Sequence, residues 1–230
     1  DRMIATPKTP PRLVLIAPAP VIRTGARLQL DVKFVEGMEM HCAQWPGPVC
    51  CILREGADSI AFAVEVAPDA LDFDIRVLAS GEEISADTLK GTSVVLVSGD
   101  DAGNLDIPAL ARSQGAKACL NLEYTLETRL RIAWLDRSRS LARRLYSLIW
   151  ALRQERRRRR AVAQSDAVQA NGYPAFDACR KINPDTLLYL DNRMAGPLFA
   201  SAQEMTARAD RLASGAPLRL VYSGRLETLK

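Results

Sequence analysis

The chain has 230 residues and a net charge of +4, with 48% hydrophobic and 25% charged residues, which are ordinary values for a globular protein. Its apolar runs are far shorter than the roughly 20 residues of a membrane-spanning helix. Residues 1–11 are polar and proline-rich and lack the apolar stretch of a signal peptide. We therefore expect a cytoplasmic globular protein with a loose tail over residues 1–11.

Short strands and turns dominate the first half of the chain. A strand over 12–17 ends at Pro18, and a loop with Thr24 and Gly25 follows. Apolar residues at four-residue spacing then predict a helix over 28–42. Short β-branched runs bounded by Gly, Pro or Asp predict strands at 49–53, 60–66, 73–78 and 94–97. A short helix over 107–113 closes this half.

Strands and helices alternate through the second half. The predicted elements are a strand at 118–122, a long helix at 140–164, a strand at 167–170, a helix at 174–181, a strand at 187–190, a helix at 201–213 and a strand at 218–222. This alternation predicts an α/β fold with a Rossmann-like, mostly parallel sheet and helices on both faces. We expect one domain over 12–213, and over 214–230 a linker and the first strand of a second domain.

The cysteines and the single histidine argue against a metal site. The five cysteines include no C-x-x-C pair, and their odd number favours reduced thiols. Zinc needs a cluster of thiols or imidazoles, which the sequence lacks. His41 is predicted to lie on a helix with no nucleophile motif nearby, so a Ser-His-Asp triad is not expected.

The end of the chain carries the most informative motif. The apolar run 218–222 stops at Ser223 and Gly224, where the backbone can turn tightly, and Arg225 and Lys230 follow. A strand that ends in glycine, with cations after it, is where an open α/β sheet holds a phosphorylated ligand.

The segment Ser223-Gly224-Arg225-Leu226 followed by Lys230 resembles the G-R-L-x-x-x-K segment that opens the second domain of family 4-type, GT-B-fold glycosyltransferases. The order of elements is similar too, from the strand 12–17 with its Thr24-Gly25 loop to the segments 163–168 and 187–193. The resemblance implies two facing Rossmann-like domains, of which the first binds the acceptor and the second the nucleotide-sugar. It also implies transfer that retains the anomeric configuration, with no cofactor beyond the nucleotide-sugar co-substrate and no metal.

The resemblance assigns the donor diphosphate to four residues. Arg225 and Lys230 would neutralise the departing nucleoside diphosphate, whose charge grows in the transition state. Gly224 and, across the cleft, Gly25 would let the backbone approach the phosphates. The alternative is that the two cations are solvated and Gly25 belongs to an ordinary surface turn.

Glu123 is the implied catalytic residue, because it stands after a mid-sheet strand where this family often carries histidine. A carboxylate there can orient the acceptor hydroxyl or accept its proton. The alternative is a solvated glutamate, or one paired with Arg129 or Arg131. Asp100 and Asp101, after the previous strand, are weaker candidates on the same edge.

The helix 140–164 concentrates the positive charge. Residues 137–160 contain ten arginines and one acid, Glu155, so this segment carries +9, and the difference from the total of +4 leaves −5 for the rest. Its leucines fall on one stripe, with Tyr146 beside them, and such a basic amphipathic helix can lie on anionic lipid. The residues predicted to face a membrane are Arg143, Arg144, Trp150, Arg153, Arg156, Arg157 and Arg158. Alternatively, the stripe packs on the sheet.

Three functions remain open at this stage. The first is a glycosyltransferase, peripheral on the inner face of the membrane, that moves a sugar from a nucleotide-sugar to a saccharide or lipid-linked saccharide; the chain alone would be inactive. The second is a non-catalytic module that docks on a membrane or another anionic partner. The third is a nucleotide-dependent oxidoreductase, although Pro18-Ala19-Pro20 replaces its G-x-G-x-x-G loop. Nucleic acid is the least favoured partner, because no recognised motif accompanies the arginines.

Overall fold

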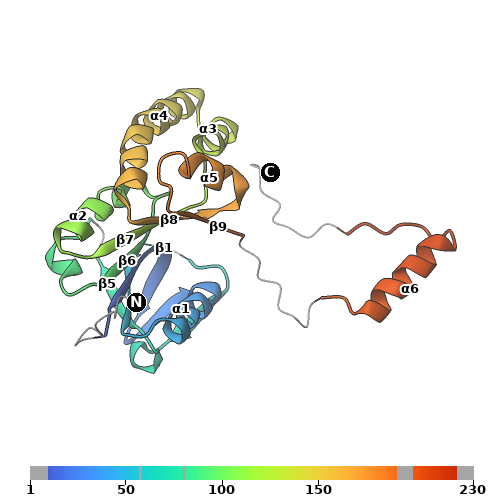
Figure 1. Ribbon diagram of the computed structural model, residues 1–230, viewed down its shortest axis with the longest axis horizontal. Helices are drawn as coiled ribbons and strands as arrows, with labels where there is room; N and C mark the ends of the chain where they lie inside the picture. The colour runs from blue at the N-terminus through green and yellow to red at the C-terminus, as the bar shows by residue number, and fades with distance from the viewer. Residues whose placement is uncertain (1–9, 57–58, 80, 191–198, 222–230) are drawn as a thin grey trace, which may run out of the picture.

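One mixed sheet organises the computed structural model, which describes residues 10–56, 59–79, 81–190 and 199–221. Seven parallel strands run in the order β5-β3-β1-β6-β7-β8-β9, and β2 and β4 add an antiparallel extension (Figure 1). The strands are β1 Leu13–Thr24, β2 Arg27–Asp31, β3 Val49–Glu55, β4 Ala63–Val66, β5 Asp74–Leu78, β6 Val94–Ser98, β7 Lys117–Leu122, β8 Ala167–Asn171 and β9 Thr186–Tyr189.

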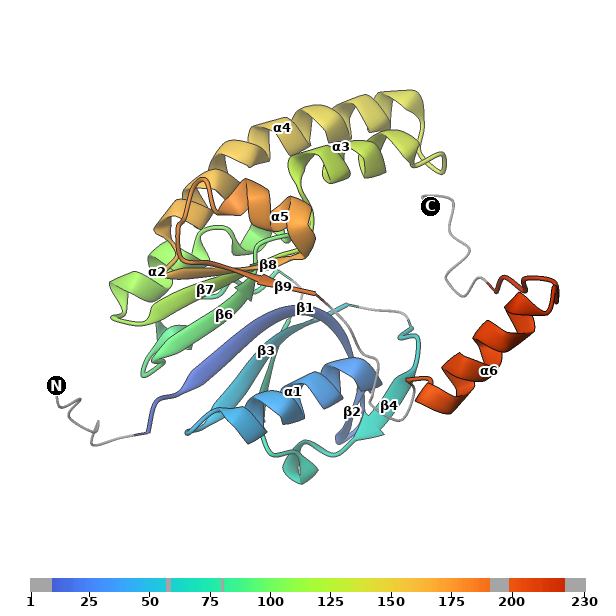
Figure 2. The same ribbon diagram turned by 45° about the vertical axis from the view of Figure 1, so that its right-hand side comes forward.

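Helices cover both faces of this sheet, as the sequence predicted. The helices are α1 Val32–Gln44, α2 Ile107–Ser113, α3 Leu126–Leu135, α4 Leu141–Gln164, α5 Gly172–Cys179 and α6 Ala202–Ala213, with 3-10 turns at Pro68–Ala70, Asp87–Leu89 and Ala102–Asn104. Side chains alternate across each strand, so Val14 and Ile16 join the core beneath α2, α4 and α5. Leu13 and Leu15 join the core beneath α1 (Figure 2). The predicted α/β class with a mostly parallel sheet is therefore confirmed.

The first strand is longer than predicted. β1 continues past Pro18 to Thr24, because the register against β3 shifts between Ile16 and Pro20 and the strand bends into the antiparallel extension. Its end pairs with β2 through a two-residue turn, with Thr24 opposite Arg27. Gly25 occupies that turn with a φ of 61°, a conformation that glycine adopts without strain.

The helix predicted over 28–42 is wrong in its first turn. Residues Arg27–Asp31 form β2, in which Leu28 and Leu30 are buried on either side of the less buried Gln29. The helix starts at Val32, because the Asp31 side chain caps it by accepting the Lys33 N–H at 2.7 Å. Leu30 continues the four-residue spacing of Phe34 and Met38, which is why the helix was predicted to begin early, whereas Leu28 and Leu30 follow the two-residue period of a strand; strand pairing decided between the two.

Helix α3 was not predicted, and it changes the surroundings of α4. Thr125 caps it by accepting the Thr128 N–H at 3.2 Å. The helix then runs back along α4, so that α3 and α4 form a helical hairpin (Figure 2). We call these two helices, with the turn between them, the α3–α4 hairpin.

The described end of the chain lies outside the sheet. Ser201 and Glu204 form a capping box at the start of α6, whose residues are all exposed. The strand predicted at 218–222 is absent from its described part: residues 216–221 lack regular structure, and Leu220 is 85% exposed. An apolar run becomes a strand only where another strand pairs with it, and these residues pair with none of the described strands.

The cysteines are free thiols, as predicted. Cys50, Cys51 and Cys179 are buried, whereas Cys42 and Cys119 are half-buried. Burial raises the pKa of the Cys119 thiol to about 11, so this thiol is protonated and unreactive at neutral pH.

Candidate functional site

A pocket of about 450 Å³ opens where the pairing of β1 with β6 ends and at the carboxyl ends of β6 and β7. The chain builds the sheet outward from β1 through β3 to β5, then returns to β6 on the other side of β1 and continues to β9. The pocket therefore lies where the strand order reverses, which is the usual ligand position in open α/β sheets. Its walls are Leu15, Ile16, Ala17, Pro18, Lys33, Phe34, Gly37, Met38, His41, Leu96, Val97, Ser98, Asp100, Asn121, Glu123 and Tyr124.

Helix α1 supplies one wall of the pocket. Phe34, Met38 and His41 are spaced by four and three residues, so they share the face of α1 that turns toward the pocket. Gly37 lies on the same face, and a Cβ at this position would meet no atom within 4 Å. The open space above Gly37 therefore belongs to the pocket.

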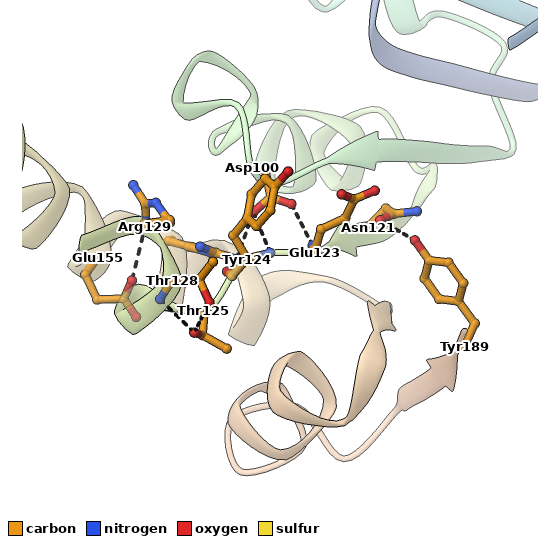
Figure 3. A network of polar contacts seen from close by, with 10 residues as sticks. Asp100, Asn121, Glu123, Tyr124, Thr125, Thr128, Arg129, Glu155 and Tyr189 are labelled. Atoms are coloured by element: carbon orange, nitrogen blue, oxygen red, sulfur yellow. Dashed lines mark hydrogen bonds and ion pairs between the residues drawn. The ribbon is translucent and has the colours of Figure 1, made fainter. Parts of the chain in front are cut away.

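The polar wall is built on Asp100, which follows β6. Its Oδ2 accepts the backbone N–H of Glu123 at 2.6 Å, and its Oδ1 accepts the N–H of Tyr124 at 3.4 Å (Figure 3). Arg158, from the far half of α4, donates Nη2 to Asp100 Oδ1 at 3.0 Å and also to the Tyr124 carbonyl. This ion pair is nearly enclosed, with 7% and 16% of the two side chains exposed. Asp100 and Arg158 thus fix the segment that carries Glu123.

Glu123 lies on the rim of the pocket. Its backbone is held by Asp100, while its exposed side chain lines the opening. Asn121, two residues earlier, also lines the pocket and accepts the Tyr189 hydroxyl at 3.0 Å, which ties β7 to β9 (Figure 3). The arginines once considered as partners of Glu123 pair elsewhere: Arg129 with Glu155 and Arg131 with Glu127.

His41 is a site residue that the sequence reasoning set aside. The sequence argues against a metal site and a Ser-His-Asp triad at His41, but its helical spacing from Phe34 and Met38 places it on the pocket face. Burial lowers the pKa of His41 from 6.5, so its imidazole is neutral at pH 7. A neutral imidazole can accept a proton or a hydrogen bond from a ligand hydroxyl.

The lowered pKa of His41 predicts acid sensitivity. Below 6.5 the unfolded chain binds a proton that the folded chain disfavours, so stability falls as the pH falls through this value. Thermal unfolding between about pH 8 and pH 5 should show this loss, and His41→Gln should lose less stability over the same range. Equal pH dependence in the two proteins would contradict the assignment.

The other predicted site residues divide into three groups. Gly25 lies in the β1–β2 turn, and it is not among the pocket walls. Asp101 accepts the Gly103 N–H at 2.8 Å and caps a 3-10 turn. Gly224, Arg225 and Lys230 lie outside the described residues, so their donor role stays a prediction.

The membrane-facing prediction needs one correction. Arg158 is only 6% exposed and points to Asp100, because the second half of α4 packs on the domain. Arg144 is half-buried, with its guanidinium 5.6 Å from the centre of the Trp134 ring on α3. Arg157 pairs with Asp106 at 2.6 Å. Arg143, Trp150, Arg153 and Arg156 are exposed.

Among the described residues, no group of three or more His, Cys, Asp or Glu side chains could hold a metal ion. In the same part of the chain, no helix combines the length and the apolar content that crossing a bilayer requires.

No protein-family model matches the chain, and no curated protein matches it either. Solved structures give distant matches to GT-B-type plant glycosyltransferases. Phytolacca americana UGT2 complexed with UDP-2-fluoro-glucose and pterostilbene matches at 10% identity and a TM-score of 0.45, over 86% of this chain and 56% of its own. A UDP-glucosyltransferase from Polygonum tinctorium, capable of glucosylating indoxyl, matches at 10% and 0.41, over 88% and 57%.

Os79 from O. sativa, in complex with UDP and deoxynivalenol-3-glucoside, matches at 12% identity and a TM-score of 0.41, over 89% of this chain and 63% of its own. This chain thus spans between half and two thirds of the length of these structures. Scores below 0.5 assign no family, and the family 4 resemblance stays a prediction.

Proposed function

We propose that the chain is the acceptor-binding domain of a glycosyltransferase that moves a sugar from a nucleotide-sugar to a hydroxyl group on a saccharide or lipid-linked saccharide. The observation that carries the proposal is the pocket at the strand-order reversal, which combines an apolar wall on α1 with a carboxylate on its rim. The donor side rests on the resemblance of residues 223–230 to the start of a nucleotide-sugar-binding domain.

The pocket supplies what the acceptor half of this reaction needs. The acceptor hydroxyl oxygen forms a bond to the anomeric carbon while the bond from that carbon to the diphosphate breaks. The hydroxyl proton passes to the Glu123 carboxylate, or to the neutral imidazole of His41 on α1. The nucleoside diphosphate leaves with its negative charge neutralised by Arg225 and Lys230. Retention of the anomeric configuration is part of the proposal through the resemblance alone, and it requires the hydroxyl to attack the face of the sugar from which the diphosphate departs.

Phe34, Met38 and Tyr124 offer an apolar surface for the rest of the acceptor. Sugar rings stack on aromatic side chains, and a lipid-linked saccharide adds an apolar portion next to its sugar, so both acceptor classes fit this wall. An oxidoreductase is less well supported, because Ala17 and Pro18 line the pocket where a dinucleotide would need a glycine-rich turn.

A side chain introduced at position 37 would enter the pocket without displacing core residues. Gly37→Leu should raise the acceptor KM roughly 10- to 200-fold, since a misfit of even one methylene in an apolar site has an effect of this size. Gly37→Ala is the matched control: it should leave KM unchanged and stabilise the helix by about 0.5–1 kcal/mol. Steady-state transfer by the full-length protein and thermal unfolding measure the two effects. An unchanged KM in Gly37→Leu would show that the acceptor does not bind in this pocket.

A further inference from the structure

The α3–α4 hairpin carries many large apolar side chains that are exposed and lie outside the buried core. Nine large apolar residues on its two helices are between 37% and 68% exposed: Ile132, Trp134, Leu135, Leu141, Leu145, Tyr146, Ile149, Trp150 and Leu152. Single exposed apolar residues are normal on soluble proteins, but a run of them on two packed helices marks an interaction surface. We call these nine residues the hairpin patch.

The hairpin patch faces away from the domain. The buried residues of α4 are Ala151, Arg158, Ala161 and Val162, so only the second half of the helix packs on the domain. The first half, residues 141–150, contains no buried residue, and neither does α3. Figure 2 shows the hairpin extending past the end of the sheet. From the sequence, the apolar stripe of α4 could also pack on the sheet. In the structure, its residues Leu141, Leu145, Ile149 and Leu152 are exposed.

Cations border the patch and remain available to a partner. Arg143, Arg153 and Arg156 are exposed and form no ion pair within the described part of the chain. Five other arginines of the hairpin and its turn pair with acids, and these pairs balance only part of the charge; the acids are Asp100, Asp106, Glu127, Asp136 and Glu155. The patch therefore lies inside a strongly positive surface, and its partner is anionic.

The order of side chains around α4 is that of a helix lying in a lipid interface. Leu141, Leu145, Ile149 and Leu152 follow one another at four-, four- and three-residue spacing and form an aliphatic stripe. Tyr146, Trp150, Arg153 and Arg157 form the adjacent stripe, so aromatic rings and guanidinium groups border the aliphatic side chains. Aromatic rings favour the headgroup level, and long arginines reach outward from the apolar boundary to the phosphates.

A bilayer fits these observations better than other anionic partners do. Duplex DNA offers phosphates to the arginines but nothing apolar for four exposed aliphatic side chains. We therefore propose that the hairpin patch docks, without crossing, onto the surface of an anionic phospholipid membrane. The aliphatic stripe enters the boundary between headgroups and acyl chains, and the bordering arginines pair with lipid phosphates.

This docking goes beyond the proposed function and does not depend on it. It nevertheless concerns the same pocket, because α3 begins directly after the segment that carries Glu123 and Tyr124. Arg158 of α4 holds that segment through Asp100. The docked hairpin is therefore connected to the pocket directly, through the start of α3 and through the Asp100–Arg158 pair.

Vesicle binding by the whole chain tests the proposal. Vesicles of phosphatidylcholine with one quarter phosphatidylglycerol should bind the chain at low salt, release it at high salt, and bind far more strongly than pure phosphatidylcholine vesicles. Arg143→Ala/Arg153→Ala/Arg156→Ala should weaken binding roughly 100-fold, about fivefold for each cation. Arg180→Ala, which changes an exposed arginine at the C-cap of α5, is the control and should bind as the unaltered chain does.

The apolar variant separates a membrane from the other partners. Leu145→Ser/Ile149→Ser should lose at least about tenfold in vesicle affinity, because two aliphatic side chains no longer enter the lipid. If the serine variant unfolds, the triple arginine variant, which changes only exposed side chains, still tests whether the hairpin binds vesicles. The proposal would be overturned by no binding to the anionic vesicles at low salt, by unchanged vesicle binding by a folded serine variant, or by a dimer in solution that the serine variant converts to monomers. Tighter binding to a 20-base-pair DNA duplex than to vesicles, unaffected by the serine changes, would also overturn it.

Discussion

Arg158→Met should lower the free energy of unfolding by about 3–5 kcal/mol, because the change leaves Asp100 enclosed without its cation. The pair is the least exposed of the ion pairs among the described residues, and Arg158 Nη2 also donates to the Tyr124 carbonyl. For a domain of this size the loss corresponds to a melting temperature lower by roughly 6–20 °C. Methionine keeps much of the side-chain volume, so the loss of charge dominates the effect.

Arg157→Met is the matched control on the same helix. Its ion pair with Asp106 is short, at 2.6 Å, but 43% and 81% of the two side chains are exposed. Solvent screening limits such a pair to about 1 kcal/mol or less. Chemical or thermal denaturation of the two variants measures the difference. Similar losses in both would show that the Asp100–Arg158 pair is not the anchor of the pocket segment.

Asp100→Asn combined with Arg158→Met should lose less stability than the sum of the two single changes. The amide oxygen of asparagine still accepts the Glu123 N–H, and no charge is left enclosed when both partners are neutral. Additive losses in this double-mutant cycle would contradict direct coupling between the two side chains.

Glu123→Gln should lower the kcat of glycosyl transfer by about 10²- to 10⁴-fold, the range over which a positioned general base acts. The variant should keep the contact with Asp100, because that contact uses the backbone N–H of residue 123. The acceptor KM should change little, since glutamine has nearly the same shape. A glutamine still lines the pocket but cannot take up the hydroxyl proton.

Glu127→Gln is the control for Glu123→Gln, four residues further along the chain. Glu127 pairs with Arg131 on the exposed face of α3, where both side chains are more than 70% exposed. Its change should leave kcat and stability close to those of the unaltered protein. If Glu123→Gln keeps its kcat while His41→Gln loses activity, the base is His41 and the role assigned to Glu123 is wrong.

The parallel core of the fold was predictable from the sequence because its strands are short, β-branched and bounded by turn residues. The antiparallel extension was predicted only in part: the predicted strand 60–66 covers β4, whereas β2 fell within the predicted helix because Leu30 continues the four-residue spacing of Phe34 and Met38, and only pairing with the end of β1 selects the strand. The bend in β1 that allows this pairing is a register shift, which leaves no trace in composition.

The site was predictable in part for a similar reason. Glu123 could be located because it follows a recognisable strand. Arg158 stands within a run of five arginines, residues 156–160, and its burial depends on Asp100, 58 positions away in the sequence. Local spacing says nothing about such a partner. The pocket itself needed α1, β1, β6 and β7 to meet, which only the sheet order establishes.

Transfer of a labelled sugar by the full-length protein, with Glu123→Gln and Gly37→Leu measured side by side, tests most directly whether the pocket is an acceptor site. We predict that Glu123→Gln loses kcat and keeps KM, whereas Gly37→Leu raises the acceptor KM and keeps kcat. The two kinetic signatures would place the base and the acceptor in one pocket. Transfer by both variants at the unaltered rate and KM, or no transfer from any nucleotide-sugar by the unaltered protein, would contradict the proposed function.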